Sequence, residues 1–524
     1  MTAQGGDATG RFAAPLLAAL AGLLLLVAHP PVGMWWTTFL APAALLAALH
    51  LRPERSALLG GLAGLSAFAP MLTWLIEPAG ALAWVLLSLV MAAYLAGLAA
   101  VLRPALGSPW LPVVTAIGWV GMDAWRGVFP MSGFEWAAIS YAHVDGSFVL
   151  PVARLLGGRG ITLLVVLISA AAFVTVRGTV RAVRERDGGP VEGQLGATRV
   201  PVALLVGGLL ASVLLTIEPP PEVGELDVVA VQGQDFTWPQ APPNASVAIA
   251  TTLAERTVAA TAEDTPDLVV WAEASIERDP DSDAGAAYRA PLADGTRAAG
   301  RLLTGVNVDG PDPAATYHRA AVLYDEDGRV LDRYDKRQLV PFGEYVPFRD
   351  LIGWFPPLQR VPRDAIAQDG PSVIELEDVR IAVLICFETL YPGVTRSNVL
   401  TDGDPADLIV ATTTTSSFGD SAAPQQHLSQ SQLRAVETGR WVVHVAQSGT
   451  TAFVAPDGTA HDATDTFVQD DIRRQVPLVE GRTPFLVVGD VLGVAGRVGA
   501  LLLVAWTLVW HRRRRRDGAP AGTR

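Results

Sequence analysis

The stretch RIAVLICFETLYP, residues 380–392, carries the clearest indication of fold in this 524-residue chain. Its apolar residues 381–385 form a strand-like run that ends at Cys386, the single cysteine of the sequence, and Glu388 follows shortly after. An α/β enzyme commonly places its nucleophile at such a strand end. A free cysteine is also among the most buried residue types and usually packs as a small apolar side chain. Taken alone, Cys386 favours this second, structural interpretation.

Similar apolar, β-branched runs surround this stretch between residues 218 and 484. They are DVVAVQ, DLVVWAE, RLLTGVNV, HRAAVLYD, RIAVLICFE, DLIVATTTT and WVVHVAQSG. Polar or helix-like segments separate them, and helices are expected over residues 245–264 and 425–439. The pattern predicts an α/β or α+β domain of about 260 residues, which is within the range of one domain.

The rest of the chain has the composition of a polytopic membrane protein, because 50% of all residues are hydrophobic and only 17% are charged. Eight apolar stretches occur, at about 12–28, 35–50, 57–76, 80–102, 110–128, 155–176, 200–217 and 485–510. We therefore predict an N-terminal membrane domain of about seven helices (1–217), an α/β domain (218–484), a C-terminal membrane helix (485–511) and a basic tail (512–524).

Arginines in the short connections predict the orientation. Positions 52, 55, 103, 177, 181, 184, 186, 199 and 512–516 are arginine and lie on one side of the predicted spans. The positive-inside rule makes this side cytoplasmic, together with both termini, and leaves residues 218–484 outside. Arg126, Arg154 and Arg159 are exceptions on the outer side.

Several classes of site are not expected. A single cysteine excludes an intrachain disulfide and a cysteine-rich metal centre, and the eight histidines show no metal-binding spacing. The sequence also has no P-loop or GxGxxG motif. From these observations together we expect neither a metal nor another cofactor. The net charge of −13 makes nucleic acid an improbable partner.

Two further reactive groups follow strand-like runs: Glu273 in DLVVWAEAS, and Lys336 in RYDKRQLVPFGEYVPF. Lys336 is the only lysine among 39 basic residues, in a chain that uses arginine everywhere else. A carboxylate can take a thiol proton, and an ammonium group can hold the oxyanion of a tetrahedral intermediate. Each residue alone also fits a solvated loop or a surface ion-pair cluster.

On the segments WAEAS, YDKRQLVPFGEYVPF and ICFE, the chain resembles the nitrilase (carbon–nitrogen hydrolase) superfamily, which uses a Glu–Lys–Cys triad in this order. Within it, RAVETGRWVV (434–443) and the eight-span layout resemble the bacterial membrane enzymes that N-acylate lipoproteins. The resemblance covers nearly the whole chain. It implies an α-β-β-α sandwich outside a bacterial plasma membrane that is crossed by the α-helical domain.

The resemblance also implies residue roles. Glu273 corresponds to the general base, Lys336 to the oxyanion-stabilising cation, and Cys386 to the nucleophile that becomes a thioester. Glu344 corresponds to an accessory glutamate that organises the site. Glu388 corresponds to a carboxylate that orients Lys336 or the loop around it.

Two aromatic residues are candidates for substrate contact. Trp238 resembles a tryptophan on a mobile substrate-contacting loop, although a packed surface aromatic explains it equally well. Phe387 stands where many relatives have tyrosine, so no hydroxyl there is needed in our mechanism. TTTTSSFGD (412–420) and Gln-Ser-Gly (447–449) also depart from the commoner patterns, which leaves the acceptor and lipid preference open.

The implied activity is transfer of an acyl chain from a membrane phospholipid, through a cysteine thioester, to the N-terminal amine of a diacylglyceryl-cysteine lipoprotein, by a membrane-embedded monomer. One alternative is a membrane-tethered amidase, which would use the same triad. Another is a non-catalytic receptor or transporter with an external ligand-binding domain, which would form no covalent intermediate.

Overall fold

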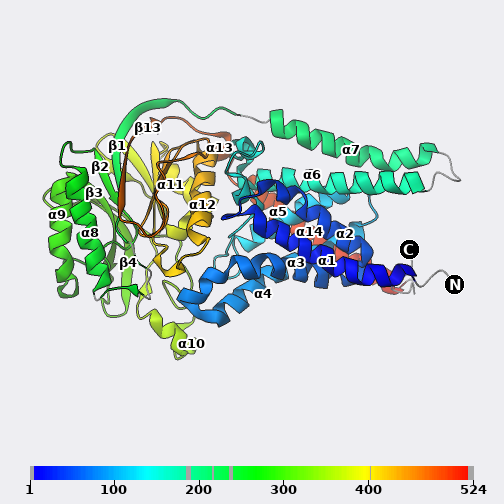
Figure 1. Cartoon of the computed structure of the whole chain (residues 1–524), viewed down its shortest axis with the longest axis horizontal. Coiled ribbons are helices and arrows are strands. Elements are labelled where there is room, and N and C mark those ends of the chain that lie inside the picture. The colour runs from blue at the N-terminus through cyan, green and yellow to red at the C-terminus, as the bar shows by residue number, and fades with distance from the viewer. Residues whose placement is uncertain are drawn as a thin grey trace. The chain divides into compact units, whose positions relative to one another are not determined.

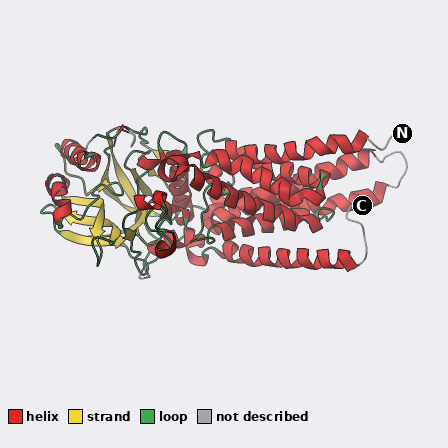
Figure 2. Ribbon diagram, turned by 90° about the horizontal axis from the view of Figure 1, so that it is seen from below, coloured by secondary structure: helices red, strands yellow, loops and turns green. Residues whose placement is uncertain are grey.

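The computed structural model describes residues 5–184, 191–214, 217–234, 236, 240–242, 244–401 and 403–516 (Figure 1). The chain divides into two compact units. The first comprises residues 1–76, 81–217 and 490–524, and the second comprises residues 77–80 and 218–489. Strands occur only in the second unit among these residues (Figure 2).

The described part of the first unit is helical. Its α-helices are α1 (Gly5–Ala28), α2 (Ala41–Leu51), α3 (Ser56–Met71), α4 (Ile76–Leu102), α5 (Leu111–Arg126), α6 (Ala153–Arg184), α7 (Val191–Leu214) and α14 (Val491–Arg516). Two of them are kinked where a glycine has a positive φ, at Gly80 in α4 and Gly157 in α6. A glycine adopts this conformation without the steric cost that a Cβ would add.

Three helical segments among the described residues are long and apolar enough to cross a membrane: Thr73–Ala105, Leu150–Arg181 and Val491–Arg516. Three shorter apolar helical segments accompany them: Phe12–Ala28, Trp35–Leu51 and Arg199–Leu214. A span generally needs about 20 apolar residues. The structure therefore supports a membrane-embedded unit, while three spans rather than eight meet the criteria of length and composition.

The C-terminal helix α14 packs against α5 and α6. At the closest approach, a Cβ added to Gly121 of α5 would lie 2.4 Å from the carbonyl oxygen of Gly496 in α14. Such glycine contacts bring helix backbones together in membrane proteins. The indole of Trp125 donates to the carbonyl of Arg497 (3.2 Å), and Arg159 pairs with Asp490 (3.3 Å) just before α14 begins.

The second unit contains two sheets. The first has the strand order β13-β1-β2-β3-β4-β5, with β6 paired to β4: β1 (Glu222–Gln232), β2 (Leu268–Trp271), β3 (Arg301–Asp309), β4 (Thr316–Asp325), β5 (Val330–Asp335), β6 (Asp364–Ala365) and β13 (Asp470–Val479). The second has the order β12-β11-β10-β9-β8-β7: β7 (Ile374–Leu376), β8 (Val379–Ile385), β9 (Leu408–Thr413), β10 (Val442–Ala446), β11 (Ala452–Val454) and β12 (Ala460–His461).

Helices cover one face of each sheet. Buried residues of α8 (Ala245–Ala260) and α9 (Arg289–Ala299) share a hydrophobic core with β1 to β4. Residues of α11 (Pro392–Val399) and α12 (Ala423–Thr438) share a second core with β8, β9 and β10. The shorter α10 (Arg349–Ile352) and α13 (Pro484–Val488) lie in connections. Because β1 and β2 also contact β10, the unit has the order helix, sheet, sheet, helix (Figure 1).

The strands β1, β2 and β3 run parallel, as do β8, β9 and β10. All seven expected runs lie in strands. Six of them form these parallel strands, which are buried on both faces and therefore nearly continuously apolar. The seventh, HRAAVLYD, lies in β4, which is antiparallel to β3 and β5. The C-terminal helix begins at Val491, later than the expected residue 485. Gly489 has a positive φ and separates α14 from α13, which belongs to the second unit.

Candidate active site

Cys386 lies at the point where β8 ends. Residues 381–385 of this strand are buried, and Cys386 begins the short 3-10 helix Cys386–Leu390 with a φ of 54°. A positive φ is uncommon for a residue other than glycine, and such strained turns occur at nucleophiles that follow a strand. The Cys386 side chain is 7% exposed. This burial agrees with the structural interpretation of Cys386. The residues around the thiol therefore decide between a structural and a catalytic role.

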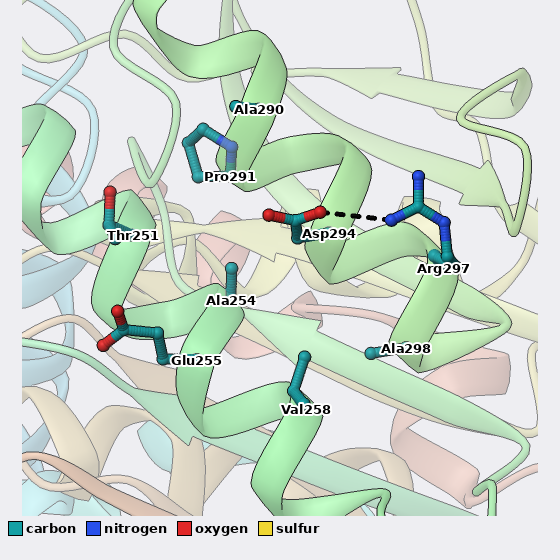
Figure 3. Close-up of a pocket in the computed structure, with 9 residues that line it drawn as sticks. All are labelled: Thr251, Ala254, Glu255, Val258, Ala290, Pro291, Asp294, Arg297 and Ala298. Carbon is teal, nitrogen blue, oxygen red and sulfur yellow. Dashed lines mark hydrogen bonds and ion pairs between the residues drawn. The ribbon is translucent and has the colours of Figure 1, made fainter.

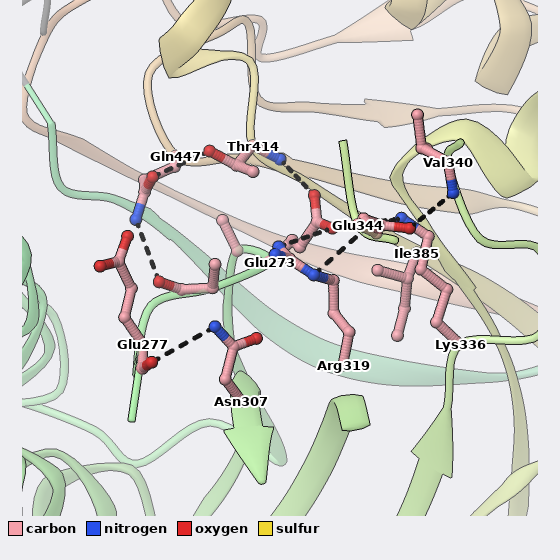
Figure 4. A network of polar contacts seen from close by, with 12 residues as sticks. Glu273, Glu277, Asn307, Arg319, Lys336, Val340, Glu344, Ile385, Thr414 and Gln447 are labelled. Atoms are coloured by element: carbon pink, nitrogen blue, oxygen red, sulfur yellow. Dashed lines mark hydrogen bonds and ion pairs between the residues drawn. The ribbon is translucent and has the colours of Figure 1, made fainter. Parts of the chain in front are cut away.

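Glu273 follows β2 and accepts three hydrogen bonds. Its Oε1 lies 3.4 Å from Nζ of Lys336 and 3.1 Å from Nη1 of Arg319 (Figure 4). Its Oε2 accepts the backbone N–H of Thr414 at 2.9 Å. The charges of Glu273 and Lys336 both act on the Cys386 thiol. The side chains of the expected base, cation and nucleophile are therefore brought together.

Lys336 follows β5 and is completely buried. Its Nζ lies 2.5 Å from Oε1 of Glu344, which is closer than Glu273. The second oxygen of Glu344 accepts the backbone N–H of Val340 at 2.8 Å, so this glutamate also holds the loop that carries it. Glu344, the expected accessory glutamate, thus lies beside Lys336, the residue that would stabilise the oxyanion.

Arg319 in β4 is a member of the site that our sequence analysis missed. Besides Glu273, its guanidinium contacts Oε1 of Glu344 at 3.3 Å. The available signal was a charged residue inside the otherwise apolar run HRAAVLYD, next to a histidine. Because edge strands also carry such charges, the sequence pattern did not distinguish Arg319 from a solvated residue.

The protonation states follow from these contacts. Burial raises the pKa of the Cys386 thiol to about 12, with the Glu273 charge adding to the effect and Lys336 opposing it. Burial alone would raise the pKa of Glu273, but Lys336 and Arg319 more than compensate and lower it. Burial likewise opposes the charge of Lys336, whereas Glu344 and Glu273 raise its pKa. The resting site therefore holds a neutral thiol beside an ionised carboxylate, and attack requires the thiol proton to move to that carboxylate.

Glu388 holds two segments in place. It accepts the backbone N–H groups of Arg337 (2.8 Å) and Gln338 (3.0 Å), which follow Lys336, and that of Ile385 (2.8 Å), which precedes Cys386. The hydroxyl of Tyr334 lies 3.0 Å from both of its oxygens. Of the two expected roles, these contacts support orientation of the loop around Lys336. The carboxylate joins this loop to the strand end that carries the nucleophile.

We expect Glu388→Gln to destabilise the second unit, because one amide oxygen cannot replace both carboxylate oxygens and its NH₂ would face backbone donors. The cost of leaving buried donors unsatisfied is about 1–3 kcal/mol for each group. Thermal unfolding of the purified protein would measure it as a lower Tm. Tyr334→Phe is the matched control: it removes one donor to Glu388 and an acceptor of Asn398, which still donates to the Val383 carbonyl, and because it leaves the carboxylate and its backbone partners intact it should cost less. An unchanged Tm for Glu388→Gln would contradict this role.

The structure describes one of the two aromatic candidates for substrate contact, Phe387. Phe387 is 8% exposed, and its ring stacks with Phe418 and with His427, both at a centroid distance of 6.1 Å. Burial lowers the pKa of His427 to about 4, so this ring is neutral at physiological pH. Contact of Phe387 with a substrate stays a prediction. Trp238 lies outside the described residues.

Both unusual loops take part in the site. Thr414, in the stretch 412–420, donates its backbone N–H to Glu273 and its hydroxyl to the side-chain oxygen of Gln447 (3.0 Å). Gln447 in turn donates to the carbonyl of Ala274 at 3.5 Å. These departures from the commoner pattern therefore form one connected group behind the proposed base (Figure 4).

A surface pocket of about 520 Å³ lies elsewhere, between α8 and α9 (Figure 3). It is lined by Thr251, Ala254, Glu255, Val258, Ala290, Pro291, Asp294, Arg297 and Ala298. Asp294 and Arg297 pair with one another at 3.1 Å. No candidate catalytic residue lines this pocket, and no cluster of three potential metal ligands occurs in the part of the chain that the structure describes.

Comparisons with known proteins agree with this geometry. Residues 21–171 match the apolipoprotein N-acyltransferase N-terminal domain, and residues 231–472 match the carbon–nitrogen hydrolase domain. Among solved structures, a variant of an amidase from Nesterenkonia sp. AN1 is 18% identical, with coverage of 52% of this chain and 97% of that chain. Its TM-score of 0.36 is too low to indicate a function.

Relatives of similar length are more informative. The apolipoprotein N-acyltransferase of Chromobacterium violaceum is 30% identical over 518 residues, which is 95% of this chain and 94% of the relative. That of Geobacter metallireducens is 29% identical over 517 residues, or 94% of each chain. The family resemblance is thereby confirmed over both domains. Because the similarity extends along nearly the full length of both proteins, this chain belongs to the apolipoprotein N-acyltransferase family of the nitrilase superfamily.

Proposed function

We propose that the protein transfers an acyl chain from a membrane phospholipid to the N-terminal amine of a lipoprotein's diacylglyceryl-cysteine. The observation that supports this most directly is the convergence of Glu273 and Lys336 beside Cys386. An ionised carboxylate, a buried ammonium group and a protonated thiol are the groups that acyl transfer through a thioester requires.

In the first step, the Cys386 sulfur attacks the carbonyl carbon of the phospholipid ester while Glu273 accepts the thiol proton. The ammonium group of Lys336 stabilises the resulting oxyanion. The carbon–oxygen bond then breaks, and Glu273 returns the proton to the leaving alkoxide. A thioester and a lysophospholipid are the products of this step.

In the second step, the neutral α-amine of the lipoprotein attacks the thioester carbonyl. Glu273 takes a proton from the attacking nitrogen, and Lys336 again holds the oxyanion. When the carbon–sulfur bond breaks, this proton reaches the departing Cys386 thiolate. The step leaves an amide on the lipoprotein and the thiol in its initial state.

We further propose that the first unit, which includes α14, crosses the membrane with eight spans, with both termini cytoplasmic and the second unit outside. The arginines of the short connections support this topology. One chain supplies all the charged groups around Cys386, so a monomer is expected to suffice. Both substrates would then lie in the same membrane leaflet, which supplies proximity.

Apolar side chains around α10 support a lipid substrate. Phe348, Leu351 and Trp354 are 76%, 73% and 76% exposed, and the neighbouring Phe342 is also exposed. This segment is joined directly to the loop that carries Glu344. Exposed apolar clusters of this kind commonly mark contact with a membrane or another apolar partner. We therefore propose that this segment faces lipid.

The proposal is tested with a phospholipid that carries a labelled acyl chain. Mass spectrometry of the wild-type protein should show a thioester at Cys386, and Cys386→Ser should not form the thioester. Addition of a diacylated lipopeptide should move the label to the peptide amine. Release of the label only into water would instead identify a membrane-tethered hydrolase, and absence of any adduct would exclude the mechanism.

A further inference from the structure

Two carboxylates and two cations form a closed ring beside Cys386. Oε1 of Glu273 contacts both Lys336 (3.4 Å) and Arg319 (3.1 Å), and Oε1 of Glu344 contacts the same two residues at 2.5 and 3.3 Å. The ring has no net charge when all four groups are ionised. The Glu–Lys–Cys triad with Glu344 accounts for only one of the two positive charges.

Without Arg319 the ring would carry two negative charges and one positive charge. In a buried site, like charges that are not neutralised keep one acid protonated. The acid affected would be Glu273 or Glu344, since both use the same Lys336 Nζ. A protonated Glu273 cannot accept the thiol proton, so excess charge that is relieved at Glu273 disables the base.

The position of Arg319 is well defined. It lies in β4, its own carbonyl accepts the backbone N–H of Lys336 at 2.8 Å, and its guanidinium lies 5.8 Å from the Tyr317 ring centroid. An arginine remains charged at all relevant pH values, and its planar fork can contact two carboxylates at once. The cation is thus fixed to the same pair of strands that positions the lysine.

We propose that Arg319 is a positioning residue that neutralises the second carboxylate of the ring, so that Glu273 stays ionised while Lys336 remains available to the oxyanion. The inference rests on the proposed function and deepens it. Burial opposes the charge of Arg319, but Tyr317, Glu273 and Glu344 together raise its pKa, which agrees with a permanent cation.

The groups that influence Glu273 come from several elements. They are Arg319 in β4, Lys336 after β5, Glu344 in the following loop, Cys386 after β8, the backbone of Thr414 after β9, and His427 in α12. His427 is neutral near pH 7 because burial lowers its pKa to about 4. Charge balance around Glu273 is therefore set chiefly by the ring.

The test compares Arg319→Gln, Glu344→Gln and the double variant in the full-length, detergent-solubilised protein. The readout is the pH dependence of alkylation by iodoacetamide at Cys386, the only thiol. Ionisation of Glu273 should give an acid limb. Arg319→Gln should raise its midpoint by about one pH unit, which slows alkylation about tenfold below the midpoint. Glu344→Gln should lower the midpoint, and the double variant should return it to near the wild-type value.

Opposite shifts that cancel in the double variant would support charge balance, because a structural defect would not be corrected by a second substitution. An unchanged midpoint in Arg319→Gln, or a larger upward shift in the double variant, would overturn the proposal. Arg319→Lys keeps the charge and should keep the midpoint even if its rate falls. If Arg319→Gln does not fold, an upward shift in Glu344→Gln or a displaced midpoint in the double variant would still refute the inference.

Alkylation does not require the correct acyl donor. If wild-type protein formed no thioester from phospholipid but showed the expected midpoint shifts, the proposed donor would be wrong and the role of Arg319 would stand. If the thioester formed and the shifts were absent, the proposed function would stand and the inference would be wrong.

Discussion

Glu273→Gln should slow formation of the Cys386 thioester by between about 100-fold and 10,000-fold, the usual contribution of a positioned acid–base group. Glutamine preserves the size of the side chain and its oxygen can still accept the Thr414 N–H. It cannot accept the proton of a thiol whose pKa burial raises to about 12. Quench-flow or manual sampling with labelled phospholipid, followed by mass spectrometry, measures the rate.

A matched control is available four residues along the chain. Glu277 also bears a carboxylate, but its Oε2 accepts the hydroxyl of Ser246 at 2.5 Å, and it is not part of the charged ring. Glu277→Gln should therefore retain a thioester rate within a few-fold of wild type. Equal losses in the two variants would indicate a general effect of removing negative charge and would contradict a proton-accepting role for Glu273.

Lys336→Met should have the other largest effect, because it removes the proposed oxyanion cation and leaves two buried carboxylates with Arg319 alone. Loss of one oxyanion donor lowers kcat by about 100-fold to 1,000-fold. Loss of one partner of a buried ion pair destabilises a protein by about 3–5 kcal/mol. Rates of thioester formation and denaturant unfolding at neutral pH measure the two effects separately.

Lys336→Arg separates charge from geometry. The chain uses arginine at all its other basic positions, yet a guanidinium is larger than an ammonium group and presents a rigid planar fork. Nζ of Lys336 fits between Glu344 and Glu273 in a completely buried site. We expect the arginine variant to be more stable than the methionine variant and to remain impaired in rate. A wild-type rate would show that any cation suffices.

The proposed triad residues could be singled out because each follows a strand-like run within a recognisable local sequence. Glu273, Lys336 and Cys386 come from β2, β5 and β8, and sequence order alone does not show that these ends meet. The family resemblance supplied this long-range information. It could not supply the distances, which place Lys336 nearer to Glu344 than to Glu273.

Arg319 was missed for a different physical reason. A strand pattern reports which residues alternate or remain apolar, but it does not report which distant charge faces each side chain. The pairing of Arg319 with two acids depends on the neighbouring positions of β2, β4 and the Glu344 loop. Strands as short as β6 and β12, each of two residues, also could not be predicted from the periodicity of apolar residues.

For the membrane spans, the sequence located the helices but did not give the number of crossings. Hydropathy located eight apolar stretches, and helices occur in all of them, but several helices have fewer apolar residues than a full crossing generally needs. Helix α3 and helix α5 each have 16 residues. Apolar composition therefore located the helices, while it did not establish how many of them cross the bilayer.

The close contact between α5 and α14 has a consequence for biosynthesis. Helix α5 is made early, whereas its partner, with Gly496 against Gly121, leaves the ribosome only after the whole second unit has been translated. The face of α5 that carries Gly121 therefore lacks its final partner while more than half of the chain is being synthesised. The helical unit can be completed only after the second unit has been translated, so a ribosome that stops near residue 489 releases the proposed catalytic groups together with a helical unit that lacks α14.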